Sequence, residues 1–128
     1  MKYYKCEICG NIFSVIDDSG VVPKCCGQDM AILNNENPSD AHAIMVNESE
    51  TMYDAKRIRV CIGENVLHPM NTDHYIKFIG LVTDKSTHTY FFNPGDKPCA
   101  KFFIRKNENI QRIYAYCNIH GMYKTDFI

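Results

Sequence analysis

Four of the seven cysteines of this 128-residue chain lie between positions 6 and 26. They form the pattern "CEIC" followed by the adjacent pair of "CCG". A Cys-x-x-Cys turn directs two sulfurs at one ion, and an adjacent pair can join them only if the backbone bends sharply, which Gly27 eases. A segment this short cannot bury an adequate core, so a bound metal must supply much of its folding free energy. We therefore predict a tetrahedral site for zinc or a single iron, with a structural zinc knuckle as the open alternative. Its ligands are Cys6, Cys9, Cys25 and Cys26.

The remainder of the chain has the pattern of a β protein. A polar, proline-containing stretch at 34–40 is interpreted as a linker, and short runs rich in β-branched and aromatic residues follow it. Several runs alternate with period two, turn-forming residues separate them, and no run keeps the apolar spacing of a helix. About seven short strands favour a sandwich. The clearest runs are 57–63, 74–83, 88–95, 100–106 and 110–117.

All five histidines lie in this β-rich part. His88 is surrounded by polar turn residues and is expected to be exposed. The other four, together with the cysteine of "YCNIHG", offer imidazole and thiolate donors that suit iron, and five ligands leave an octahedral position open for catalysis. Spacing alone does not bring these residues together, and each histidine by itself is more often solvated or packed in a core than a ligand. The candidate set is His42, His68, His74, Cys117 and His120.

Charge and hydropathy exclude several classes of partner. The net charge is −1 without any basic run, which argues against nucleic acid or an anionic membrane surface. No stretch approaches the ~20 apolar residues of a membrane span, and "MKYYKCEICG" lacks the apolar run of a signal peptide. We therefore expect a cytoplasmic protein, in which clustered cysteines are metal ligands rather than disulfides. Cys61 and Cys99, in or beside apolar strands, are interpreted as small buried hydrophobic residues.

Five elements, in this order, resemble desulfoferrodoxin, the two-iron form of superoxide reductase: "YKCEICGN", "CCGQDM", "LHPMNTDHYIKFI", "NPGDKP" and "YCNIHG". The resemblance covers essentially the whole chain. It implies a small rubredoxin- or desulforedoxin-like domain at 1–36 and an immunoglobulin-like β-sandwich of the neelaredoxin type at 37–128. It also implies two mononuclear iron ions, one tetrahedral on the four early cysteines and one square-pyramidal, with the four histidines equatorial and Cys117 axial.

The resemblance further implies an activity. Superoxide would be reduced to hydrogen peroxide with one electron from ferrous iron and two protons, and a rubredoxin-like donor would re-reduce the iron of a homodimer. The family usually has a Glu-Lys pair before the first ligand histidine, whereas this chain has Asp40-Ala41. Asp40 keeps a carboxylate that could reach the sixth position, but Ala41 removes a cation that attracts superoxide. Lys77 or Lys124 is a candidate to replace that cation in space.

Two other functions remain open from the sequence. Ala41 is compatible with a non-catalytic iron-binding electron carrier that has lost efficient superoxide turnover. The cysteine pattern is also compatible with a zinc-stabilised interaction module without redox chemistry. Against this module, a structural zinc site would not leave a sixth position free.

Overall fold

The computed structural model describes residues 2–33, 35–38 and 40–127, and this part of the chain is mainly β, without an α-helix. It divides into two compact units, Met1–Asn34 and Asn35–Ile128. The division precedes the predicted boundary after Glu36, because β6 (Asn35–Glu36) pairs in parallel with β13 (Gly121–Asp126) of the second unit. Part of the predicted linker is therefore a strand, and the functional assignment of each domain stays a prediction. No helix of the described residues is long and apolar enough to span a membrane.

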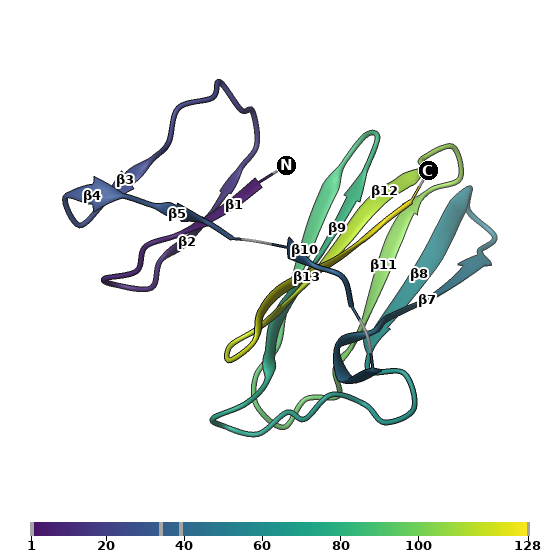
Figure 1. Cartoon of the computed structure of the whole chain (residues 1–128). Coiled ribbons are helices and arrows are strands. Elements are labelled where there is room, and N and C mark those ends of the chain that lie inside the picture. The colour runs from purple at the N-terminus through teal and green to yellow at the C-terminus, as the bar shows by residue number, and fades with distance from the viewer. Residues whose placement is uncertain (1, 34, 39, 128) are drawn as a thin grey trace. The chain divides into compact units, whose positions relative to one another are not determined.

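The first unit is built from short strands (Figure 1). Its three-stranded antiparallel sheet has the order β2-β1-β5, and a separate hairpin pairs β3 with β4. The buried cluster contains Tyr4, Cys6 and Met30, with Val15 and Cys25 packed against it. One of its three buried members is thus a predicted metal ligand. The strands are β1 (Lys2–Lys5), β2 (Ile12–Val15), β3 (Lys24–Cys25), β4 (Gln28–Asp29) and β5 (Ala31–Ile32).

The second unit consists of two sheets, as the sandwich prediction required (Figure 1). One sheet has the order β10-β9-β12-β13-β6, and the other has the order β11-β8-β7. A short 3-10 helix, η1 (Asp40–His42), precedes β7. The strands besides β6 and β13 are β7 (Ile44–Glu50), β8 (Ala55–Ile62), β9 (Ile76–Thr83), β10 (Thr87–Phe91), β11 (Cys99–Arg105) and β12 (Ile110–Cys117).

The core lies on the inner face of the three-stranded sheet and on the strands β9 and β12. On β8 the buried residues Ile58, Val60 and Ile62 alternate with outward-facing ones, as period-two patterning predicts. Burying one such side chain is worth about 1.5–3 kcal/mol. The burial of this cluster fixes the register of the strands whose ends carry the predicted ligands.

The five predicted runs are strands, and the second unit has three described strands outside them, β6, β7 and β13. β7 ends in the polar sequence "NESE", and β13 has the mixed sequence "GMYKTD". Each pairs along its length with a strongly patterned neighbour, β8 or β12. Pairing with a neighbouring strand therefore compensates for weak local patterning.

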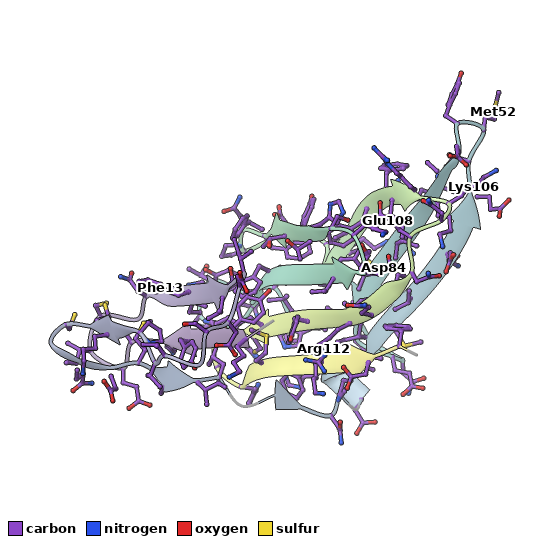
Figure 2. All side chains as sticks on the ribbon, turned by 90° about the horizontal axis from the view of Figure 1, so that it is seen from above. Phe13, Met52, Asp84, Lys106, Glu108 and Arg112 are labelled. Atoms are coloured by element: carbon purple, nitrogen blue, oxygen red, sulfur yellow. A yellow bond between two sulfur atoms is a disulfide. The ribbon has the colours of Figure 1, made fainter. Side chains whose placement is uncertain are left out.

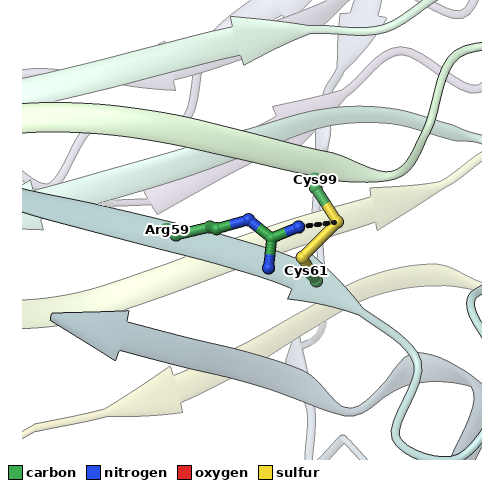
Figure 3. The surroundings of a disulfide bond; sticks show 3 residues. All are labelled: Arg59, Cys61 and Cys99. Atoms are coloured by element: carbon green, nitrogen blue, oxygen red, sulfur yellow. Dashed lines mark hydrogen bonds between the residues drawn. A yellow bond between two sulfur atoms is a disulfide. The ribbon is translucent and has the colours of Figure 1, made fainter.

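Two cysteines differ from the prediction. Cys61 and Cys99 form a disulfide and are half-buried rather than buried (Figure 3). The register of β8 and β11 places them directly opposite each other, although 38 positions separate them in the sequence. They alternate with the core residues and so face outward, which the interpretation as small core residues missed. The other five cysteines are free.

Glu108 is a buried carboxylate in the connection between β11 and β12 (Figure 2). Its Oε2 accepts hydrogen bonds from Thr83 Oγ1 and Ser86 Oγ, both at 2.6 Å, and its Oε1 accepts one from the Arg105 amide at 3.1 Å. The two hydroxyl groups lower the pKa of Glu108 to about 2, against an opposing effect of burial. Glu108 is therefore ionised and joins the β9–β10 and β11–β12 turns.

Candidate metal centres

The first centre is formed by two sharp turns. After β1, the Cys6 amide bonds to the Asn11 carbonyl and the Gly10 amide bonds back to the Cys6 carbonyl, both at 2.9 Å. At the end of β3, Cys26 has a φ of +52° and Gly27 a φ of +76°. This left-handed pair supplies the bend that the adjacent cysteines required, and Gly27 takes it up without a Cβ penalty.

The four sulfur atoms meet at one point. They lie within 4.8 Å of one another, with 3.6 Å between the sulfurs of Cys9 and Cys25 and 4.0 Å between those of Cys25 and Cys26. Cys6 is buried and Cys9 and Cys26 are exposed. The structure thus brings together all four cysteines predicted for this site, on a face that reaches solvent.

Electrostatics show why a cation completes this cluster. Hydrogen bonding from the backbone amide of Cys9 lowers the pKa of Cys6 to about 6. Contact with Cys9, and then with the other sulfurs, raises the pKa of Cys26 to about 12, and that of Cys25 is raised as well. One thiolate therefore opposes the formation of the next. A metal ion that accepts all four removes this conflict, and four thiolates in this arrangement fit zinc or iron.

The second centre draws on three separate segments of the second unit. His42 ends η1, His68 and His74 lie between β8 and β9, and Cys117 and His120 flank the turn from β12 to β13. The ligand atoms of all five lie within 4.8 Å of one another. Cys117 and His68 are buried, His42 and His74 are half-buried, and His120 is exposed.

The four imidazole rings form a closed square. Successive ring centroids are 4.9 Å apart for His42 and His68, 4.8 Å for His68 and His74, 5.1 Å for His74 and His120, and 5.0 Å for His120 and His42. The sulfur of Cys117 lies 3.6 Å from His120 Nδ1. Four imidazole nitrogens and one sulfur within 4.8 Å of one another make a five-donor set suited to iron.

The ring nitrogens are free to coordinate. The Nε2 atoms of His42, His68 and His74 are buried and have no hydrogen-bond partner among the described residues. His68 Nδ1 lies 2.7 Å from the Pro69 carbonyl, which leaves its Nε2 pointing at the cluster. Burial, followed by the neighbouring histidines, lowers the pKa of His42 to about 4, and burial also lowers the pKa of His68. These rings are therefore neutral near pH 7, the state in which imidazole binds a metal.

Local structure holds each ligand segment. The Gly63 amide donates to the Ala43 carbonyl at 2.9 Å, and Gly63 has a φ of +109°. A Cβ at Gly63 would lie 2.3 Å from the Val66 carbonyl oxygen, so only glycine permits this turn into the His68 loop. The Asn71 and His74 backbones bond to each other in a tight turn.

Two supporting residues were not predicted. Asn118 accepts a hydrogen bond from the Tyr75 amide at 2.9 Å and donates to the Asp73 carbonyl at 3.0 Å, so it links the His74 loop to the Cys117 turn. The Tyr123 ring stacks on His42 with a centroid distance of 4.1 Å and an interplanar angle of 11°. The position of Asn118 between two ligands in "CNIH" was an available signal. No corresponding signal in the local sequence pointed to Tyr123.

Asp40 and Ala41 lie immediately before His42 and are both exposed. The carboxylate of Asp40 does not belong to the group of ligand atoms around the histidines. Its carbonyl instead accepts hydrogen bonds from Ala43 and Glu64, which fix the turn. Lys124, one candidate replacement for the missing cation, is paired with Asp126 at 2.6 Å.

Two family models cover almost the whole chain. The desulfoferrodoxin N-terminal domain matches residues 1–33, and the desulfoferrodoxin domain matches residues 34–126. The chain belongs to the desulfoferrodoxin family. Desulfoferrodoxin from Desulfarculus baarsii is 37% identical over 98% of this chain and 96% of its own length. Desulfoferrodoxin from Nitratidesulfovibrio vulgaris is 33% identical over 98% of this chain and 95% of its own length.

Solved structures confirm the fold. The superoxide reductase of Treponema pallidum superposes with a TM-score of 0.78 over 98% of this chain and 97% of its own, at 20% identity. The superoxide reductase of Nanoarchaeum equitans gives a TM-score of 0.61 over 73% of this chain and 98% of its own, at 19% identity. The two donor groups match the two iron centres of a desulfoferrodoxin.

Proposed function

We propose that this chain is a superoxide reductase that converts superoxide to hydrogen peroxide at the second centre. The convergence of His42, His68, His74, Cys117 and His120 on one point carries the proposal. Relatives with related sequences are named desulfoferrodoxin or superoxide reductase. When bound there, ferrous iron would supply the single electron that superoxide needs, and the donor set of neutral imidazoles and one thiolate fits that ion.

Cys117 and His120 would have different roles, because they differ in burial. Cys117 is fully buried and approaches from the core, so its thiolate is protected from solvent. His120, in contrast, is exposed. We therefore propose that a metal held by these residues would be open to a ligand on the solvent side. A small anion then reaches this side directly, and two protons can arrive from water.

The four-cysteine unit would hold a second iron on Cys6, Cys9, Cys25 and Cys26, in a domain that we assign to residues 1–36. The sandwich domain would then span 37–128. We further propose a rubredoxin-like electron donor, a homodimer and a cytoplasmic location. Asp40 is proposed as a carboxylate that could serve as a further ligand to a metal held by the histidines and Cys117.

A superoxide pulse tests the function. The protein is purified with iron counted, reduced without oxygen, and exposed to a pulse while its absorbance is followed. We expect a fast ferric-thiolate signal from the second centre and hydrogen peroxide in the amount of the superoxide consumed. Stepwise oxidation beforehand should show two ferric-thiolate chromophores, one for each centre.

Ala41 specifically favours one other function, an electron carrier with both irons but without efficient superoxide turnover. The same pulse separates the two functions. A carrier shows both chromophores during chemical oxidation and no fast signal after superoxide. A colourless protein containing zinc in place of iron would contradict both.

A further inference from the structure

The outward face of the three-stranded sheet carries a pair of sulfurs that neither metal centre uses. Cys61 on β8 and Cys99 on β11 are direct partners in a ladder that continues for seven registered pairs, as far as Ala55 and Arg105. Their α-carbons are 4.1 Å apart. Because the ladder holds both strands, the sulfur–sulfur bond can open and close without rearranging the backbone.

One cation contacts this pair, and two more lie farther along the same face. Arg59 Nη2 lies 3.8 Å from Cys99 Sγ (Figure 3). Arg57 and Lys101 share the same outward face, because they alternate with the buried residues of their strands. Within the part of the chain that the structure describes, none of these three cations forms an ion pair with a carboxylate. A cation in contact with sulfur favours the thiolate, which is the reactive form.

A hollow of about 260 Å³ lies on the same face and shares Arg59 with the pair, although neither cysteine lines it. It is lined by Asn47, Ser49, Arg57, Arg59 and Lys101. Three cations and two neutral polar side chains suit an anionic ligand with several acceptor oxygens. Arg59 therefore connects the Cys99 sulfur to a surface that would attract a negatively charged thiol.

We propose that Cys61 and Cys99 form a reversible dithiol–disulfide couple that reduces hydrogen peroxide at the expense of an anionic thiol. The Cys99 thiolate attacks one peroxide oxygen, the oxygen–oxygen bond breaks, and a sulfenic acid forms on Cys99 as hydroxide leaves and takes up a proton. The Cys61 thiol then attacks this sulfur, its proton goes to the departing hydroxyl as water, and the disulfide forms. Two molecules of external thiol return both cysteines to the reduced state by exchange and leave as their own disulfide.

The inference rests on the proposed function only for the source of peroxide, since superoxide reduction would generate it on the same molecule. Disulfides in reducing compartments are usually transient and catalytic or redox-sensing. The half-buried, outward-facing position of both sulfurs is suitable for such a role. A purely structural disulfide needs no cation in contact with its sulfur.

The test uses the iron-loaded protein, reduced with glutathione and freed of it without oxygen. Hydrogen peroxide is added, the remaining thiols are alkylated, and the peptides that contain Cys61 and Cys99 are analysed by mass spectrometry. We expect both thiols to disappear together, with one peroxide consumed per disulfide, and to return on renewed addition of glutathione. A disulfide that glutathione cannot open in the folded protein, or thiols that survive peroxide, would overturn the proposal.

The cysteine variants identify the attacking residue. Cys61→Ser should leave a sulfenic acid on Cys99 that dimedone labels, because the resolving thiol is missing. Cys99→Ser should give no comparable label on Cys61, because the sulfur that Arg59 contacts is that of Cys99. Equal labelling in both variants would contradict the assigned order.

A matched pair of arginine variants tests the cation. Arg59→Gln should slow oxidation by peroxide about threefold, because a tenfold loss of thiolate is partly offset by the greater nucleophilicity of a more basic sulfur. Arg57→Gln removes the same charge from the same face, but Arg57 bonds to Ser49 rather than to sulfur, and its oxidation rate should change less. Equal rates for the two variants would refute the role of Arg59.

Two further outcomes distinguish failure of the cysteine couple from failure of the superoxide reductase function. If added peroxide oxidises the pair but a superoxide pulse yields no peroxide, the superoxide reductase function is refuted, whereas the Cys61–Cys99 couple is supported. If the pulse yields peroxide while the pair remains reduced, the couple fails alone. Lys101→Gln should slow re-reduction by glutathione but not by neutral 2-mercaptoethanol, and equal slowing by both would refute the anionic-thiol site.

Discussion

The first unit buries three residues in its cluster, Tyr4, Cys6 and Met30, whereas the second buries fourteen. In the first unit one of the three, Cys6, is itself a predicted metal ligand, so the core and the candidate metal site overlap. In the second unit Cys117 is one member of a large cluster whose other buried members are apolar side chains that offer no metal ligand. The metal therefore organises the first unit, whereas in the second unit the fold organises the metal site.

Loss of one sulfur ligand should destabilise the first unit, because its small core depends on the metal site. Cys9 is exposed, so Cys9→Ser costs no core packing, but it removes a ligand from a site whose binding energy is also folding energy, about 10–16 kcal/mol for comparable zinc peptides. We expect the first unit to become protease-sensitive and the iron content to fall from two to one per chain. A first unit that stays protected without metal would contradict the comparison.

Cys117→Ser should instead leave the second unit folded while disabling its chemistry. Serine is close in size, but its oxygen is a poor substitute for a thiolate. We expect superoxide-driven oxidation to slow by more than about 100-fold, beyond the usual effect of altering a supporting residue. Time-resolved absorbance after a superoxide pulse measures the oxidation rate. Cys9→Ser is the control that should retain this rate.

Glu108→Gln tests stability that does not depend on metal. The folded pKa of about 2 lies below the ordinary value of 4.5, so ionised Glu108 contributes stability above pH 4.5, and this contribution disappears as the pH falls toward 2. We expect Glu108→Gln to lower the free energy of unfolding of the second unit by about 1.5–3 kcal/mol at pH 7. The difference from the native sequence should narrow by pH 3 in urea titrations, and a constant difference would refute the assignment.

Tyr123→Leu examines how the fold orients a ligand. Removing the ring that stacks on His42 should weaken iron binding at the second centre by up to about tenfold, since aromatic pairs are worth about 0.5–1.5 kcal/mol. Chelator competition measures the affinity. Tyr123→Phe keeps the stacking and should bind as the native sequence does, so a loss in both variants would assign the effect to the hydroxyl group.

The smallest effect is expected from Ala41→Lys. Ala41 is exposed beside His42, so a lysine there adds a positive charge near the second centre without disturbing packing. We expect the rate of superoxide capture to rise a few-fold at low salt and this gain to diminish as salt is added. Ala41→Gln, which is long but uncharged, should leave the rate unchanged.

The sequence was most informative where local chemistry determines structure. The spacing of Cys6, Cys9, Cys25 and Cys26 predicted one cluster, and period-two patterning predicted β8 to β12. Convergence of His42, His68 and His74 on Cys117 could not be derived from spacing, because long-range strand pairing decides it. The resemblance to desulfoferrodoxin supplied that expectation.

The disulfide was missed for the same physical reason. Cys61 and Cys99 become neighbours only through the register of β8 and β11, and outward-facing and inward-facing cysteines differ by a single step along a strand. Asn118 and Tyr123 act through contacts across the fold, with Tyr75 and His42, which the local sequence does not reveal. Local sequence patterns thus predicted individual strands, whereas long-range strand pairing determined which residues meet at the metal site.

The order of the ligands along the chain has a consequence for biosynthesis. The first centre has all its donors once residue 26 has emerged from the ribosome, whereas the second waits for residues 117 and 120. Since domains tend to fold as they are synthesised, a nascent chain can complete its sulfur site early but cannot assemble the histidine–cysteine site until both sheets are available. A chain interrupted before the β12–β13 turn is complete therefore lacks His120, so unfinished molecules cannot form the complete five-donor centre.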